Sequence, residues 1–137
     1  YQKQVVLNAG TLAQKLLEHG FALVSGGTDN HLLLLDLSAR DMTGVQAERV
    51  LGEVGIVVNK NTIPYDTKGP KVTSGIRIGT PALSTRGMGV AVMETIADLI
   101  KMVLENPTSG SVREKARRVV SELCTTYPIY SENASEQ

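Results

Sequence analysis

The chain has 137 residues, and its 14 lysines and arginines balance its 14 aspartates and glutamates. This length is typical of one domain with a single hydrophobic core. The balanced charge offers no attraction for nucleic acid or an anionic membrane, and no apolar run reaches the ~20 residues of a membrane-spanning helix, so neither partner is expected.

The first part of the sequence predicts a helix and then two strands. Apolar residues at helical spacing mark a helix over residues 1–19, which ends at Gly20. FALVSG (21–26) is typical of a short strand, and HLLLLDL (31–37) of a strand that is buried on both faces or covered by a helix. We interpret GGTDN (26–30) as a hairpin turn, because a phosphate-binding loop would need a helix after it.

A second helix and a third strand follow. Thr43 and Gln46 have the spacing of a capping box, which predicts the start of a helix that ends at Gly55. IVVN (56–59) is a β-branched run of the kind found in strands. KNTIPYDTKGPK (60–71) contains two prolines and a glycine, and it predicts a loop.

The last part predicts one strand and two helices. GIRIG (75–79) is the strand, and an apolar stripe over residues 92–103 marks a long helix that Asn106-Pro107 closes. Ser111 and Glu114 have capping-box spacing and predict the start of the final helix.

These elements follow the order α-β-β-α-β-β-α-α. Because the connections between neighbouring strands are short, we expect hairpins and therefore a small, mostly antiparallel sheet covered by helices, which is the α+β class. We expect residues 1–130 to form one domain and the polar residues 131–137 to form a flexible tail.

Cysteine and histidine usage predicts no metal site. Cys124 is the only cysteine, which excludes an internal disulfide and favours a reducing, cytoplasmic compartment. Because Cys124 lies among apolar residues of a predicted helix, we expect a buried, inert thiol. His19 and His31 have no partners at metal-ligand spacing, so we expect both to be structural or exposed.

Arg77 is the first candidate functional residue. It lies between Ile76 and Ile78 in a predicted strand, so its side chain faces away from theirs. Arginine suits bidentate binding of a carboxylate, and the glycines at 75 and 79 would let a ligand approach the backbone. The alternative is an ordinary surface arginine paired with an acidic neighbour, and spacing alone favours that alternative.

The second candidate is the loop NKNTIPYDTKGPK. Asn59, Lys60 and Asn61 offer amide and ammonium donors where a strand is expected to end, and Lys68 and Lys71 add positive charge. Such a loop could receive an anionic or heteroaromatic ligand. The residues alone favour a solvated loop with ordinary turn chemistry. No catalytic triad or carboxylate pair is evident.

Three stretches together resemble one enzyme family. LVSGGTDNHLLLLDL (23–37), VNKNTIPYDTK (58–68) and VTSGIRIGTPALSTRG (72–87) are similar, in order and spacing, to the C-terminal domain of bacterial serine hydroxymethyltransferase. The resemblance runs over residues 1–130, and the combination is far more specific than any single motif. TKGPK departs from the family's usual loop at Gly69 and Lys71.

The resemblance implies a transferase that depends on pyridoxal phosphate, with fold-type-I architecture. The family interconverts serine plus tetrahydrofolate with glycine plus 5,10-methylene-tetrahydrofolate, in one-carbon metabolism and glycine biosynthesis. Arg77 matches the arginine that binds the α-carboxylate of serine or glycine. Asn61 matches the asparagine that hydrogen-bonds the pterin ring of folate, and Lys60, beside it, is a further folate-binding candidate.

The resemblance also indicates what the chain lacks. The family's Schiff-base lysine lies in a His-Lys-Thr segment of a large N-terminal domain, and none of the seven lysines here has that context. The sequence has no initiator methionine. We therefore expect a fragment that lacks the large domain, holds no cofactor alone and is inactive alone. We expect the full-length enzyme to be a homodimer.

Two alternatives remain open on the sequence. One is the small domain of another fold-type-I enzyme, such as an aminotransferase, which would lack VNKN and SGGTDNH. The other is a freestanding module that binds amino acids for regulation. A large apolar patch on the first helix or on the sheet would favour a domain that has lost its partner over a freestanding module.

Overall fold

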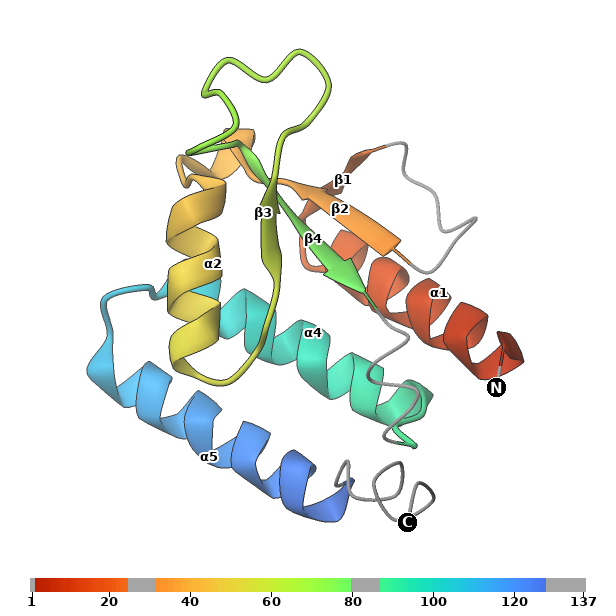
Figure 1. The fold of residues 1–137 in the computed structure, drawn as a ribbon. Coiled ribbons are helices and arrows are strands. Elements are labelled where there is room, and N and C mark those ends of the chain that lie inside the picture. The colour runs from red at the N-terminus through yellow and green to blue at the C-terminus, as the bar shows by residue number, and fades with distance from the viewer. Residues whose placement is uncertain (1, 25–31, 80–86, 128–137) are drawn as a thin grey trace, which may run out of the picture.

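The computed structural model describes residues 2–24, 32–79 and 87–127. The described helices and strands follow the predicted order and form an α+β fold, which confirms the predicted class (Figure 1). The elements are α1 (Gln2–Glu18), β1 (Ala22–Leu23), β2 (Leu32–Asp36), the 3₁₀ turn η2 (Ser38–Arg40), α2 (Gly44–Glu53), β3 (Asn59–Asn61), β4 (Gly75–Gly79), α4 (Val90–Glu105) and α5 (Gly110–Thr126). None of the described helices has the length and apolar character needed to cross a membrane.

The four described strands form one sheet in the order β1-β2-β4-β3, and each neighbouring pair is antiparallel. β4 is therefore a central strand, flanked by β2 and β3. In the register of the ladder, Arg77 of β4 lies opposite Leu34 of β2 on one side and opposite Asn59 of β3 on the other.

The hydrophobic core lies on one face of this sheet. Leu33 and Leu35 of β2 and Ile76 and Ile78 of β4 point into it, because alternate strand residues share a face. Helices α1, α2 and α4 cover this face, and α5 packs on α4 from the outside (Figure 1). Leu34, on the opposite face, is only half-buried, so β2 fits the prediction of a strand covered by a helix rather than one buried on both faces.

Local chemistry explains where α2 begins. The Thr43 hydroxyl accepts a hydrogen bond from the Gln46 backbone N–H (3.1 Å), and the Gln46 side chain accepts one from the Thr43 backbone N–H (2.9 Å). This confirms the predicted capping box. Two further N–H groups at the start of α2, those of Gly44 and Val45, donate to carbonyls of residues 72–73, which ties the helix to the segment before β4.

The predicted position of the third strand was wrong. Residues 56–58 lie outside the sheet, and the strand is Asn59–Asn61. Gly55, with φ of +95°, turns the chain at the end of α2, and Val57 is then 86% exposed while Val58 is buried. Strand propensity reports a fit to a pleated surface, whereas pairing with β4 decides which residues join the ladder.

Two predictions about α5 were also wrong. The helix begins at Gly110, and its capping residue is Ser109, whose hydroxyl accepts from the Val112 N–H (3.2 Å), instead of Ser111 with Glu114. Cys124 is exposed rather than buried, because it lies beside the stripe of α5 residues that pack on the core, between Leu123 and Tyr127, and not on it. The predicted turn at 26–30, His31 and the tail at 131–137 lie outside the described residues.

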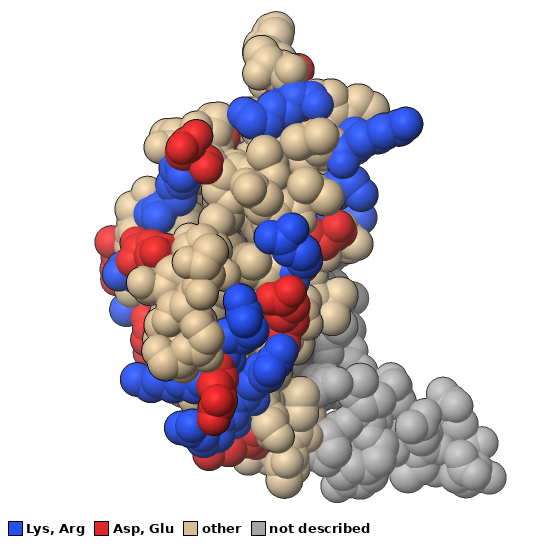
Figure 2. Space-filling view, turned by 90° about the vertical axis from the view of Figure 1, so that its left-hand side faces the viewer, with Lys and Arg blue, Asp and Glu red and all other residues tan. Residues whose placement is uncertain are grey.

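The surface over α2 and α5 carries interspersed charges of both signs (Figure 2). Arg113 of α5 pairs with Glu53 of α2 (3.2 Å). Such alternation produces no extended field of one sign on this side of the molecule.

Candidate functional site

The candidate site lies on the sheet face that points away from the core. Residues directly opposite each other in antiparallel strands share a face, so Asn59, Arg77 and Leu34 form one row across β3, β4 and β2. Asn61 and Gly75 belong to the next row on the same face. The structure thus brings the sequence-predicted residues Arg77 and Asn61 onto neighbouring strands and the same face.

The guanidinium of Arg77 is exposed, and no hydrogen bond or ion pair joins it to any described residue. Asp36 lies on the same face, diagonally across β2, but its carboxylate accepts from the backbone N–H (2.9 Å) and the hydroxyl (2.6 Å) of Ser38 instead. The acidic partner expected of an ordinary surface arginine is therefore not found in the described part of the chain.

Asn61 is half-buried at the end of β3. Its side-chain amide nitrogen donates to the carbonyl of Thr62 (2.9 Å), which fixes the plane of the amide and leaves its oxygen to accept from a ligand. Sequence reasoning placed Asn61 in a loop, but the structure places it on a strand, where the ladder sets its position relative to Arg77.

Lys60 lies on the opposite face of β3 from Asn61, because neighbouring strand residues alternate. Its backbone N–H donates to Glu48 of α2 (3.1 Å), and its ammonium lies 4.0 Å from the same carboxylate. The geometry therefore ties Lys60 to α2 and separates it from Asn61 and Arg77 by the thickness of the sheet.

Gly75 has a different role from the one that the sequence suggested. A Cβ at this position would lie 2.6 Å from the carbonyl oxygen of Leu35, 2.8 Å from the Ile63 side chain and 3.0 Å from the carbonyl oxygen of Asn61. The chain itself occupies the space beside Gly75. The lack of a side chain at Gly75 lets the backbones of the neighbouring strands pack close to it. The interpretation that Gly75 makes room for a ligand was therefore wrong.

Asp66 organises the loop between β3 and β4, and sequence reasoning gave it no such role. Its carboxylate accepts from the N–H groups of Lys68, Ser74 and Ile63 and from the Ser74 hydroxyl, at 2.8–3.1 Å. These donors, the Lys68 N–H foremost, lower the pKa of Asp66 to about 2 against the effect of burial. The signal in the sequence is an aspartate between Pro64 and Gly69, because aspartate often bonds nearby backbone in turns.

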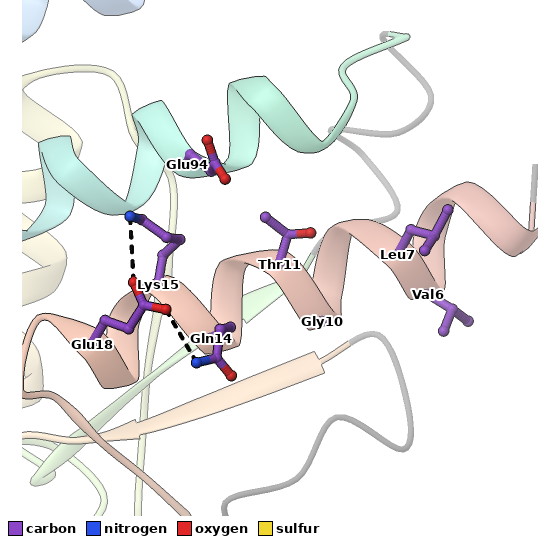
Figure 3. Close-up of a pocket in the computed structure, with 8 residues that line it drawn as sticks. All are labelled: Val6, Leu7, Gly10, Thr11, Gln14, Lys15, Glu18 and Glu94. Carbon is purple, nitrogen blue, oxygen red and sulfur yellow. Dashed lines mark hydrogen bonds and ion pairs between the residues drawn. The ribbon is translucent and has the colours of Figure 1, made fainter.

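A hollow lies on the helical side of the molecule, between α1 and α4 (Figure 3). It has a volume of about 460 Å³ and is lined by Val6, Leu7, Gly10, Thr11, Gln14, Lys15, Glu18 and Glu94. Its charged side chains are already engaged in part, since Glu18 pairs with Lys15 (3.4 Å) and accepts from Gln14 (3.1 Å). In the described part of the chain, no group of three or more His, Cys, Asp or Glu residues is arranged so that it could bind a metal ion.

The fold and the site together define an α+β domain whose sheet, on the face away from the core, presents an exposed arginine that no described residue pairs with and a hydrogen-bonded asparagine. Comparison with known sequences identifies the family. The sequence model for serine hydroxymethyltransferase matches residues 1–100, and the chain belongs to that family. A curated serine hydroxymethyltransferase from Desulforapulum autotrophicum is 52% identical over 136 residues, which cover 98% of this chain and 32% of that protein. The chain thus spans about a third of the length of this relative.

Proposed function

We propose that this chain is the C-terminal, substrate-binding domain of a serine hydroxymethyltransferase, which interconverts serine plus tetrahydrofolate with glycine plus 5,10-methylene-tetrahydrofolate. The observation that carries the proposal is the exposed guanidinium of Arg77, unpaired by any described residue and on the same sheet face as Asn61. Family membership supports it. The complete reaction belongs to a longer protein, because this chain spans only 32% of its relative.

In this proposal Arg77 binds the α-carboxylate of serine or glycine. A guanidinium offers two parallel N–H donors to the two oxygens of a carboxylate, and the charge strengthens both bonds. Such a two-point contact fixes the rotation of the amino acid as well as its position. Arg77 contributes orientation to the reaction, and orientation is a large part of the rate that an enzyme can supply.

Asn61 binds the folate in this proposal. Its amide can donate to and accept from the polar edge of a heteroaromatic ring such as a pterin. Because Asn61 and Arg77 project from neighbouring strands on one face, the two ligands would be held side by side. Lys60 is left outside this contact, since it pairs with Glu48 on the other face.

The described residues do not fit pyridoxal phosphate, the cofactor of the family. Each of the seven lysines is exposed or half-exposed, and Lys15, Lys60 and Lys101 are paired with glutamates. A Schiff-base lysine is instead held in a pocket that suppresses its charge. We therefore assign the cofactor to the part of the enzyme outside this chain and derive no step through it.

The test uses the full-length enzyme with Arg77→Ala, measured as glycine formation from serine and tetrahydrofolate. Loss of a charge-assisted, bidentate contact should lower kcat/KM for serine about 100-fold or more, since such contacts are worth about 3 kcal/mol. Arg118→Ala on α5 removes an equally exposed arginine far along the chain and should leave the rate unchanged. Near-normal activity of Arg77→Ala would contradict the assignment of Arg77. A wild-type enzyme without folate-dependent activity would contradict the function itself.

A further inference from the structure

Asp66 joins the two ends of the loop formed by residues 62–74. One of its carboxylate oxygens accepts from the backbone N–H groups of Ile63 (3.1 Å) and Ser74 (2.8 Å). The other accepts from the Lys68 N–H (2.8 Å) and from the Ser74 hydroxyl (2.9 Å). A single side chain thus holds the first turn of the loop against its last residue.

These two ends lead directly to the candidate site. Ile63 follows Asn61 by two residues, and Ser74 immediately precedes Gly75, the residue that pairs with Asn61 in the ladder. The carboxylate of Asp66 therefore holds β3 and β4 together at the end where Asn61 pairs with Gly75. Arg77 lies two residues further along β4. Loss of this contact would let the end of β3 move relative to β4.

The backbone conformation of the loop 62–74 is strained at two residues, and side-chain hydrogen bonds such as those of Asp66 hold it in place. Tyr65 and Thr73 both have positive φ, +60° and +59°, although neither is glycine. A non-glycine residue in this conformation costs free energy and persists only where its surroundings hold it. The Thr73 hydroxyl donates to the Gly75 carbonyl (3.0 Å), and the Thr73 carbonyl accepts from the Gly44 N–H at the start of α2 (3.0 Å).

We propose that Asp66 is a positioning residue, which holds Asn61 and Arg77 in the one arrangement that binds folate and the amino acid together. This inference rests on the proposed function of the two residues. Asp66 acts through the loop, because all four of its hydrogen bonds go to the chain itself. The carboxylate keeps its charge throughout the physiological pH range, since its pKa is about 2.

A positioning role for Asp66 affects the binding of both ligands, whereas direct contact with one ligand would affect that ligand alone. If the loop is closed only part of the time, the apparent affinity of each ligand falls by the fraction of closed molecules. Because one loop aligns both binding residues, glycine and the folate should lose affinity by the same factor. A residue that touched only one ligand would weaken only that ligand.

The experiment consists of two separate calorimetric titrations of the full-length enzyme, one with glycine alone and one with 5-formyl-tetrahydrofolate alone, because a first ligand would itself favour the closed loop and hide the loss for the second. Asp66→Asn keeps the size of the side chain but replaces one acceptor oxygen by an NH₂ group that faces N–H or O–H donors. We expect both dissociation constants to rise about tenfold, by equal factors. Ser74→Ala removes only the hydroxyl bond and should give about a threefold rise in both. Asp41→Asn removes an exposed carboxylate elsewhere and should change neither.

The outcomes distinguish failure of the positioning role of Asp66 from failure of the proposed function. Unchanged affinities in a folded Asp66→Asn enzyme, or a loss confined to one ligand, would overturn the positioning role and leave the proposed function intact. If Asp66→Asn does not fold, Ser74→Ala decides the question by the same comparison. An equal loss in Asp41→Asn would show that charge alone is responsible and would also overturn the role. A wild-type enzyme that binds neither ligand would instead refute the proposed function.

Discussion

A side chain at Gly75 would meet the backbone of both neighbouring strands, and Gly75→Ala tests this close packing of the sheet. The added Cβ would lie 2.6 Å from the Leu35 carbonyl oxygen on one neighbouring strand and 3.0 Å from the Asn61 carbonyl oxygen on the other. The Ile63 side chain, at 2.8 Å, can rotate away, but the two carbonyls belong to the ladder. Relief therefore requires β2 and β3 to move apart, and we expect a loss of about 3 kcal/mol, the upper end for overpacking.

The assay is urea unfolding of the chain, followed by circular dichroism, with the free energy compared at constant slope. Gly52→Ala is the matched control, because a Cβ at Gly52 in α2 would meet nothing within 4 Å. Replacing a helical glycine by alanine should stabilise the chain by about 0.5–1 kcal/mol. If Gly75→Ala is as stable as wild type, the close packing at β4 is refuted. If both variants lose stability equally, the loss reflects glycine replacement in general.

Two further predictions concern a helix cap and acid stability. Thr43→Ala should lower the free energy of unfolding in urea by about 1 kcal/mol, because the Gln46 N–H loses its acceptor. Thr43→Ser keeps the hydroxyl and should recover most of this loss. If Thr43→Ala is as stable as wild type, the capping box contributes nothing to stability. The pKa of Asp66 lies at about 2, below its ordinary value of 3.8, so its stabilising effect is complete above about pH 4 and is lost as the pH falls toward 2. Asp66→Asn should therefore show a weaker decline of the unfolding midpoint between pH 4 and 2 than wild type, and equal declines would contradict this origin of the acid sensitivity.

Local patterns were enough to predict most of the fold. The helix that ends before Gly20, the capping box at Thr43 and Gln46, and the strand at 75–79 all depend on residues close in sequence, and the structure confirms each of them. β3 was misplaced because its bounds depend on where β4 pairs with it, which no local pattern records. Cys124 was misjudged for a similar reason, since the rotation of α5 against its neighbours decides which of its residues pack on the core, and Cys124 is not among them.

The candidate site was only partly predictable. Period-two alternation gave the orientation of Arg77 correctly, because this needs no knowledge of neighbouring strands. Whether Arg77 had an acidic partner depended on the register with β2 and on the Ser38 contacts of Asp36, which only the folded chain shows. The separation of Lys60 from Asn61 followed once β3 proved to be a strand, since adjacent strand residues point to opposite faces.

The sheet has two unlike faces, and their difference explains why the site lies where it does. Leu35 and Ile76 are fully buried on the core face and contribute stability, so a polar ligand there would displace core packing and leave polar groups unpaired. The face with Arg77 and Asn59 has no described helix over it, and its polar groups can change partners without loss of the core. β4 is paired on both sides, and the loop held by Asp66 fixes the end of β3 against the start of β4, which holds Asn61 and Arg77 relative to each other. A ligand that arrives at this face meets side chains whose positions the fold has already fixed, so little of its binding free energy is spent on ordering them.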